Sequence, residues 1–290
     1  MNLSIIIISY KSNHLIEKII SSTENKFEII IIENSLDMLL KKKLESKYNN
    51  LEVFVPEKNL GFAKAVNLGI KKAKNQFAFV MSPDAEISAE CFRKISNLLD
   101  KFKDFTMLSP TYFDEKVYKN YEIRNKNEEK KNIKIENHNL FEVDEIDGGA
   151  FIINKDKIDS NSTMDENFFL YYESTDLCLR LRKQGKKLFV IDNLKFIHHG
   201  TKSSDPNFKL DIQISRNWHY CWSKFYFFKK HYGYFFGIKK TLPNLFRSLT
   251  LCFVNFIKND KESLKLHRAE FSGLINSYFL KKSFYRVLSD

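Results

Sequence analysis

Short apolar runs and helical periodicity alternate along the first part of the chain. Continuous β-branched runs over residues 4–9 and 28–32 predict buried strands, and a third short run covers residues 51–55. Between the first two runs, apolar residues recur at spacings of three and four from Leu15 to Ile20, which predicts a helix. Strands alternating with helices through short connections indicate an α/β fold with a mostly parallel sheet flanked by helices.

The same alternation is densest over residues 59–87, where a loop signal, a helical pattern and an apolar run follow one another. The run at residues 77–81 is apolar throughout, as in a strand buried on both faces. Pro83 cannot continue a central strand, so the chain delivers Ser82 and Asp84 just beyond the strand's carboxyl end. Ligands bind at that edge in open α/β sheets, and a carboxylate there suits Mg²⁺ or Mn²⁺ bridging a diphosphate. A turn capped by Asp84, without any ligand, fits the local pattern equally well.

A second informative segment covers residues 165–185 and predicts a helix that ends at Gly185. Three- and four-residue spacing places Glu173, Asp176 and Arg180 on one face of this helix. Such a face could carry a general base, or it could belong to an ordinary helix that contains an Asp176–Arg180 ion pair.

Taken together, these motifs resemble the inverting glycosyltransferases of family 2, which have the GT-A fold. The pattern N-x-G-F-x-x-x-x-N-x-G begins at Asn59 and is followed by an apolar strand and a Ser-Pro-Asp turn. The resemblance covers roughly residues 3–203. It implies transfer of a hexose or deoxyhexose from a UDP- or dTDP-linked sugar to the hydroxyl of a saccharide or lipid-linked acceptor. The expected setting is the synthesis of cell-surface polysaccharide or glycolipid.

The resemblance also implies site residues. Gly148 and Gly149 stand where the family approaches the acceptor, and His198 stands where a histidine approaches the metal or diphosphate, with Asp84 as the other metal ligand. The positions implied in donor binding are Ser9, Tyr10, Glu33, Asn59, Gly61, Asn67, Ser82 and Asp84.

One position departs from the family pattern. The second acid of the family's helix motif, commonly assigned as the catalytic base, is Ser174 here, and a hydroxyl cannot serve as a comparable base. Glu173 or Asp176 must then take the proton, and we favour Glu173 because it is adjacent and reaches further. A non-catalytic, membrane-associated descendant of the fold remains an alternative. A sugar-phosphate nucleotidyltransferase is another, although the first loop reads SYKSNH and lacks that class's glycine-rich, basic signature.

Charge and aromatic residues are concentrated at the end of the chain. Of the net charge of +11, residues 216–290 supply +10, from 14 basic and 4 acidic residues, and they include both tryptophans. We therefore expect a GT-A domain at residues 1–215 and a basic helical extension at residues 216–290. We also expect peripheral binding of residues 218–257 to an anionic membrane surface.

Other sequence features bear on partners and compartment. No nucleic-acid-binding motif accompanies the high isoelectric point, so a nucleic-acid partner is not expected. Four isolated cysteines and the absence of a long apolar run or signal peptide favour the cytoplasm, on the inner face of the membrane. Residues 114–139 are highly charged and predict a long exposed loop.

Overall fold

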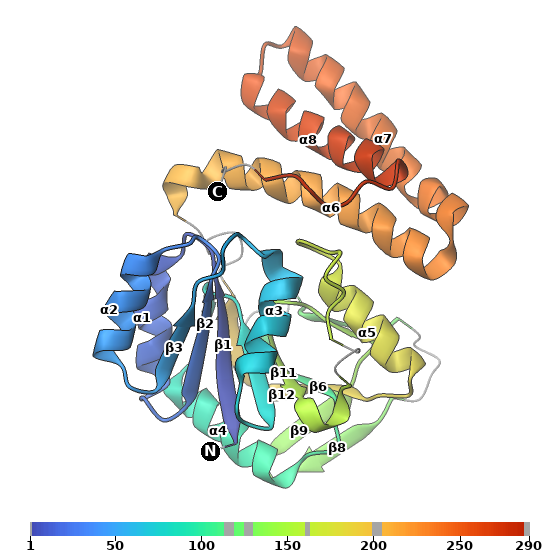
Figure 1. Ribbon diagram of the computed structural model, residues 1–290. Coiled ribbons are helices and arrows are strands. Elements are labelled where there is room, and N and C mark those ends of the chain that lie inside the picture. Colours follow the sequence, from blue (N-terminus) through green and yellow to red (C-terminus); the bar gives the residue numbers. More distant parts are fainter. Residues whose placement is uncertain (1, 113–118, 125–129, 160–162, 199–204, 287–290) are drawn as a thin grey trace. The chain divides into compact units, whose positions relative to one another are not determined.

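The computed structural model describes residues 2–112, 119–124, 130–159, 163–198 and 205–286 (Figure 1). The chain forms two compact units. Unit 1 comprises Met1–Leu60, Lys64–Met164 and Ser174–Asp205, and unit 2 comprises Gly61–Ala63, Asp165–Glu173 and Pro206–Asp290. The boundary expected at residue 216 lies inside a continuous helix that begins at Lys209.

Unit 1 is built around a sheet in which ten strands of the described chain take part, in the order β3-β2-β1-β4-β11-β6-β12-β9-β8, with β5 paired to β12. The neighbours β3-β2-β1-β4 and the pair β6–β12 are parallel, while β11 runs antiparallel to β4 and β6. A separate antiparallel pair joins β7 and β10. The strands are β1 Leu3–Ser9, β2 Glu28–Glu33, β3 Leu51–Phe54, β4 Phe77–Met81, β5 Ala85–Glu86, β6 Met107–Tyr112, β7 Tyr121–Glu122, β8 Asn132–Ile135, β9 His138–Glu142, β10 Glu145–Ile146, β11 Ala150–Asn154 and β12 Leu188–His198.

Helices cover this sheet because their apolar stripes pack on its continuously apolar strands. The side chains of Asp37 and Ser88 cap α2 and α4, each accepting from backbone N–H groups of the first turn. Gly69 lets α3 approach β1 closely, since a Cβ atom there would lie 2.4 Å from Ile6 Cγ2. The helices are α1 Asn13–Ser22, α2 Met38–Lys47, α3 Gly61–Lys72, α4 Ala89–Lys101 and α5 Glu173–Lys183, with a 3₁₀ turn η1 at Lys155–Lys157.

The segment predicted as one long loop contains regular structure. Within residues 114–139, β7 and β8 form and β9 begins, while residues 113–118 and 125–129 lie outside the described chain. The prediction is wrong for the strand residues. A four-residue alternation such as Asn132–Ile135 is too short to stand out among so many charges.

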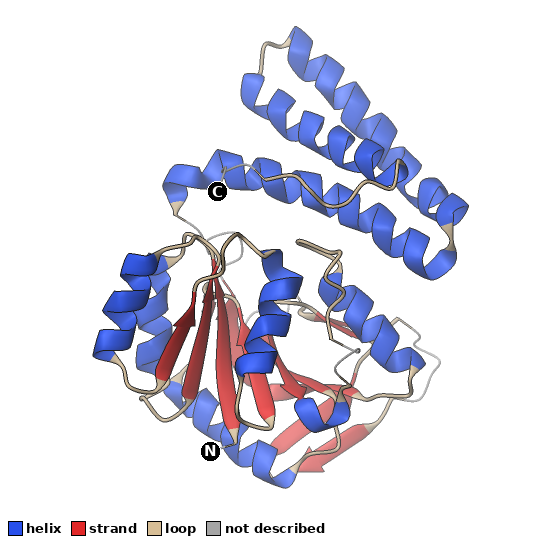
Figure 2. Cartoon of the chain, viewed as in Figure 1, coloured by secondary structure: helices blue, strands red, loops and turns tan. Residues whose placement is uncertain are grey.

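Unit 2 contains the 3₁₀ turn η3 (Pro206–Phe208) and the helices α6 (Lys209–Tyr232), α7 (Tyr234–Ile257) and α8 (Lys261–Tyr278). Figure 2 shows that every strand of the described chain belongs to unit 1. Trp218 is fully buried between α6 and α8, where a Cβ atom on Gly273 would lie 2.3 Å from the Trp218 carbonyl oxygen. In the part of the chain that the structure describes, no helix has the length and apolar character needed to cross a bilayer.

Candidate active site

The acidic turn begins where β4 ends, at the carboxyl edge of the parallel strands. The Ser82 N–H donates to the Gly149 carbonyl oxygen at 2.9 Å, and the Ala85 N–H closes the turn onto the Ser82 carbonyl oxygen at 3.0 Å. Asp84 is buried, and the Ser82 hydroxyl donates to its Oδ1 atom. The turn therefore fixes one carboxylate at the strand end.

His198 reaches this carboxylate because β12 ends beside the turn. The last residues of β12 pair antiparallel with β5, and His198 lies opposite Ala85. The His198 Nε2 atom is 3.3 Å from Asp84 Oδ1. The two residues that the sequence assigns to a metal are thus brought together across 114 positions of the chain.

Tyr112 and Asp147 hold the other side of the imidazole. The Tyr112 hydroxyl donates to Asp147 Oδ2 at 2.9 Å and lies 3.0 Å from His198 Nδ1, and the two rings stack at a centroid distance of 5.4 Å. Because the phenol proton is directed to Asp147, Nδ1 is the nitrogen that donates to the phenol oxygen. A neutral His198 then presents the lone pair of Nε2 beside the Asp84 carboxylate.

This donor set suits a divalent cation. Two adjacent ligand atoms about 2.1 Å from an octahedral ion lie about 3.0 Å apart, close to the Asp84–His198 separation. Within the described chain, no group of three histidine, cysteine, aspartate or glutamate side chains is arranged to hold a metal ion. A cation held by Asp84 and His198 would keep several positions for phosphate oxygens and water, as Mg²⁺ usually does.

Asp84 and His198 shift each other's pKa values. Burial opposes ionisation of Asp84, but the hydrogen bond and the charge of His198 outweigh it and hold the pKa of Asp84 below its ordinary value. Burial likewise favours a neutral His198, yet Asp84, assisted by Asp147, raises the pKa of this imidazole. Without a cation the pair tends to retain a proton, and binding of a cation would release that proton.

Gly149 closes the same cluster. Its N–H donates to Asp147 Oδ1 at 2.9 Å, and a Cβ atom there would lie 2.9 Å from the Tyr112 hydroxyl. Gly149 is buried and Gly148 is half-buried. The close approach explains why a glycine stands at residue 149, and the acceptor role of both glycines stays a prediction.

Ser9 and Glu33 end neighbouring parallel strands and lie opposite each other in the sheet. Both side chains are fully buried. Glu33 Oε1 accepts from the Ser35 N–H at 2.7 Å, whereas Glu33 Oε2 and Ser9 Oγ have no hydrogen-bond partner among the described residues. Buried polar atoms are nearly always paired, so a polar ligand or a water molecule would satisfy these two oxygens. Tyr10 follows Ser9, half-buried, with its N–H 3.3 Å from the Ser12 hydroxyl oxygen.

The structure gives Gly61 and Asn67 packing roles. Gly61 has a φ of +73°, and a Cβ atom there would lie 2.5 Å from the Phe169 carbonyl oxygen. The Asn67 amide donates to the Met164 carbonyl oxygen at 2.9 Å and accepts from the Met164 N–H at 3.0 Å. The side chain expected to face the donor is therefore engaged with backbone. Asn59 is half-buried in the loop before α3, and the donor contacts of these residues stay predictions.

The two candidate bases on α5 differ in their surroundings. Asp176 is fully buried, and its Oδ2 atom accepts from Arg180 Nε at 2.7 Å. Arg180 also donates to the Thr163 carbonyl oxygen at 2.6 Å, so the ion pair ties α5 to the preceding segment. Glu173 is the first residue of α5 and is 5% exposed. The environment of Asp176 is that of a structural ion pair, which leaves Glu173 as the better candidate base.

The sequence interpretation assigned no role to Tyr112, although it ends a parallel strand at the same edge as the acidic turn. It assigned no role to Asp147 either. Residues 199–204, which follow His198, lie outside the described chain.

Similarity to known proteins identifies the family of this chain. The family model for glycosyl transferase family 2 matches residues 4–161. The dTDP-rhamnosyl transferase RfbF of Shigella flexneri is 26% identical over 147 residues, which cover 49% of this chain and 49% of RfbF. The low-salt glycan biosynthesis hexosyltransferase Agl10 of Haloferax volcanii is 23% identical over 152 residues, again 49% of each chain. The chain thus spans about half the length of the curated relatives it matches.

The mannosyltransferase PcManGT of Pyrobaculum calidifontis, solved with GDP-Man and Mn²⁺, has a similar fold. It superposes with a TM-score of 0.57 at 10% identity, covering 97% of this chain and 88% of PcManGT. The predicted architecture, a mostly parallel sheet flanked by helices and followed by further helices, is confirmed. By its family match and its architecture, the chain belongs to glycosyltransferase family 2 and has the GT-A fold.

Proposed function

We propose that this protein is an inverting glycosyltransferase. It transfers a hexosyl or deoxyhexosyl group from a nucleotide-diphosphate sugar to a hydroxyl of a saccharide or lipid-linked acceptor, in the synthesis of cell-surface polysaccharide or glycolipid. The observation that carries the proposal is the pairing of Asp84 with His198 at the carboxyl edge of the sheet. The donor named for RfbF is dTDP-linked and PcManGT was solved with GDP-Man and Mn²⁺, which supports a nucleotide-sugar donor and Mg²⁺ or Mn²⁺ here.

Ser9 and Glu33 receive the nucleoside of the donor. A buried carboxylate oxygen can accept from a base N–H or a ribose hydroxyl, and the Ser9 hydroxyl can donate or accept. Their strand-end positions lie along the same edge of the sheet as the acidic turn, because β1 pairs with both β2 and β4. We keep a UDP- or dTDP-linked donor as the first expectation.

Asp84 and His198 would hold the cation, and the hydroxyl groups of Ser82 and Tyr112 orient these two side chains. A bound Mg²⁺ or Mn²⁺ would offset the negative charge that develops on the leaving diphosphate.

Glu173 acts as the general base. It takes the proton of the acceptor hydroxyl while the hydroxyl oxygen attacks the anomeric carbon from the side opposite the diphosphate, which inverts that centre. The Arg180 ion pair of Asp176 supports this choice, and Ser174 has no comparable basicity.

The test measures donor binding and donor turnover separately. Calorimetry with UDP, dTDP and GDP, each with and without Mn²⁺, should show metal-dependent binding of at least one nucleotide. Hydrolysis of the matching nucleotide-sugars should then follow. Binding without any turnover would favour the non-catalytic alternative, and the absence of metal-dependent nucleotide binding would reject the proposal.

We further propose that α7 holds the protein at an anionic membrane surface. The tryptophans and Phe225 of α6, which the sequence assigns to this contact, are buried in unit 2. On α7 the fully buried residues are small or polar: Gly237, Thr241, Ser248 and Asn255. Ile238 and Leu245 are only partly buried against the core of unit 2. Its exposed residues include Phe235, Phe246, Leu249, Phe253, Phe256 and Ile257.

The charges around this face favour anionic lipid as its partner. No acidic residue occurs from Tyr234 to Lys258, whereas Lys239, Lys240 and Arg247 interrupt the apolar stretch. Basic side chains near an anionic leaflet contribute about 1 kcal/mol each, and an exposed apolar helix face can enter the headgroup boundary.

Co-sedimentation with vesicles tests this contact. Binding should require anionic lipid and should weaken as salt rises, because salt screens exposed charges. Lys239→Glu/Lys240→Glu should reduce binding, whereas Lys71→Glu, an exposed lysine of α3, serves as the matched control. Equal binding to neutral and anionic vesicles would contradict the proposal. Concentration-dependent dimers without vesicle binding would also contradict it and would identify α7 as a self-association surface.

A further inference from the structure

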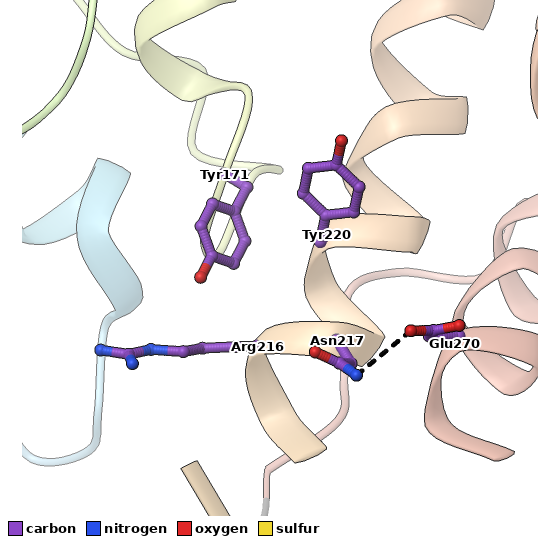
Figure 3. A pocket seen from close by; sticks show the side chains of 5 residues that line it. All are labelled: Tyr171, Arg216, Asn217, Tyr220 and Glu270. Carbon is purple, nitrogen blue, oxygen red and sulfur yellow. Dashed lines mark hydrogen bonds between the residues drawn. The ribbon is translucent and has the colours of Figure 1, made fainter. Parts of the chain in front are cut away.

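Unit 2 contains a pocket that the proposed chemistry does not use. Its volume is about 230 Å³, and it is open to solvent on one side. Figure 3 shows that the lining comes from three segments of unit 2, the loop before α5, helix α6 and helix α8. The lining residues are Tyr171, Arg216, Asn217, Tyr220 and Glu270.

One side of the pocket is a polar wall whose side chains are held in place. Asn217 Oδ1 accepts from Gln213 Nε2 at 2.8 Å, and Asn217 Nδ2 donates to Glu270 Oε1 at 3.3 Å. The other oxygen of Glu270 lies 3.3 Å from Arg247 Nη1 and 3.2 Å from His267 Nδ1. These contacts determine which way the amide and the carboxylate face, so their remaining hydrogen-bonding positions are preorganised.

The other side is aromatic. The rings of Tyr171 and Tyr220 meet edge to face at a centroid distance of 5.7 Å, and Tyr172 also lies 5.7 Å from Tyr220. Tyr220 is 43% exposed, an unusual position for a ring packed against two others. The backbone of both other tyrosines is left-handed, with φ of +69° at Tyr171 and +66° at Tyr172. Such conformations are sparsely populated for residues other than glycine and cluster at ligand sites.

The polar side and the aromatic side of the pocket together indicate which class of ligand it would bind. A sugar ring has an apolar C–H face that packs on aromatic rings and an edge of hydroxyls that both donate and accept. Glu270 supplies acceptors, and Asn217 supplies both a donor and an acceptor. The Glu270 carboxylate disfavours a phosphate or another anion. The volume is below the roughly 300–1,000 Å³ of pockets for drug-sized ligands, and it suits a single ring.

The pocket also lies close to the candidate base. Tyr171 precedes Glu173 by two residues, and both belong to unit 2. Burial raises the pKa of Tyr171, Arg216 lowers it, and the nearby charge of Glu173 raises it further. The carboxylate that would deprotonate an acceptor hydroxyl is thus electrostatically coupled to the pocket wall.

We propose that this pocket is an acceptor subsite that binds one neutral pyranose ring of the acceptor glycan, stacked on Tyr220 and hydrogen-bonded by Asn217 and Glu270. The assignment of the bound sugar as acceptor rests on the proposed transferase function. Binding of the sugar itself does not, because it requires neither donor nor metal.

The experiment uses the full chain without donor or metal. Saturation-transfer NMR with methyl glycosides of glucose, galactose, mannose, rhamnose and N-acetylglucosamine should detect binding of at least one, with inorganic phosphate as the anionic comparison. Tyr220→Ala should weaken the binding roughly tenfold or more, whereas Tyr220→Phe should retain it. Tyr232→Ala, which removes an exposed tyrosine from the end of the same helix, is the matched control. Fluorescence of Trp218 and Trp222 in unit 2 verifies that each variant is folded.

The outcomes separate this inference from the proposed function. Glycoside binding that depends on Tyr220 supports the subsite even if no nucleotide-sugar is hydrolysed. Binding to none of the glycosides, or binding that Tyr220→Ala leaves unchanged, overturns it even if the donor is turned over. In an active enzyme, Tyr220→Ala should raise KM for the acceptor, and an unchanged KM for the acceptor would also overturn the acceptor assignment.

Discussion

The first strand of unit 1 and helix α7 of unit 2 distribute polar and apolar residues in opposite ways. Strand β1 buries all of its residues and ends in Ser9, at the carboxyl edge of the parallel strands. Helix α7 buries Thr241, Ser248 and Asn255, and it turns phenylalanines such as Phe253 outward. In unit 1 this strand buries its apolar residues in the core, and its last polar side chain lies at the candidate site. In unit 2, helix α7 leaves several large apolar side chains exposed.

The candidate site of unit 1 and the exposed face of α7 are completed in different ways. The Asp84–His198 pair is completed by strand pairing within unit 1, so folding alone assembles it. An exposed apolar helix face gains stability only when another surface covers it. Changes in unit 1 should therefore alter chemistry, whereas changes on α7 should alter location.

The largest effect is expected from removal of the unit 1 carboxylate. Asp84→Asn keeps the size of the side chain but loses the charge that a cation needs, and metal-assisted stabilisation is worth several kcal/mol. We expect metal-dependent donor affinity to be abolished and kcat/KM to fall roughly a thousandfold. Calorimetry and steady-state kinetics measure the two quantities. The control is Asp192→Asn, which changes an exposed aspartate of β12. Unchanged donor affinity in Asp84→Asn would show that Asp84 does not hold the cation.

The next largest effect is expected from changes to the two candidate bases of α5, Glu173 and Asp176. Glu173→Gln should lower kcat roughly a hundredfold or more while donor binding persists, because general-base catalysis is lost. Asp176→Asn should lower the free energy of unfolding by about 1–3 kcal/mol, since Arg180 loses its charged partner inside the protein. Kinetics and urea unfolding of both variants test the contrast. Should Asp176→Asn abolish turnover while Glu173→Gln does not, the roles are exchanged.

A third prediction concerns the pH dependence of unit 2. His219 Nε2 donates to the Tyr285 carbonyl oxygen at 2.9 Å, and Nδ1 accepts from the Ser283 hydroxyl at 2.9 Å. Burial and then the charge of Arg286 lower the pKa of this imidazole to about 3. The neutral ring therefore stabilises unit 2 fully above the ordinary pKa of about 6.5, and this stability is lost as pH falls towards 3.

Because half of the unfolded-state imidazole is already protonated at pH 6.5, the loss reaches about 1.4 kcal/mol per pH unit only below that pH. Unfolding should therefore become roughly fifteenfold more favourable between pH 6.5 and 5. Tryptophan fluorescence reports on this unit, because Trp218 and Trp222 both lie in α6. His219→Phe should reduce stability at neutral pH but flatten the dependence on pH. An equally steep dependence in that variant would assign the effect to other groups.

The smallest effect is expected on the outer face of α7. Phe253→Ser/Phe256→Ser removes two exposed rings, so unfolding should change little while partitioning onto anionic vesicles falls roughly tenfold or more. Phe279→Ser, an exposed ring that follows α8, is the matched control. Equal partitioning of the unmodified protein, the double variant and the Phe279→Ser control would show that α7 does not face the membrane. The exposed apolar face of α7 would then require a protein partner to cover it.

Much of unit 1 follows from local pattern. The strands at residues 4–9, 28–32 and 77–81 are found as β1, β2 and β4, because continuously apolar β-branched runs suit strands buried on both faces. The acidic turn after β4 was predicted as well, since a proline beyond a buried strand ends it and directs the next side chains to the sheet edge. These features depend on a few consecutive residues, which the sequence displays directly.

Other features were decided only by the tertiary structure. The pairing of β12 with β5 brings His198 to Asp84, and Tyr112 meets Asp147 through strands far apart in the chain. The sequence places basic and aromatic residues in the last helices, but apolar residues occur on more than one face of α6 and α7. Which faces are buried depends on how the three helices pack, and that packing turned Trp218 inward and Phe253 outward. Local periodicity contains no information about the partner helix, so it could not make that choice.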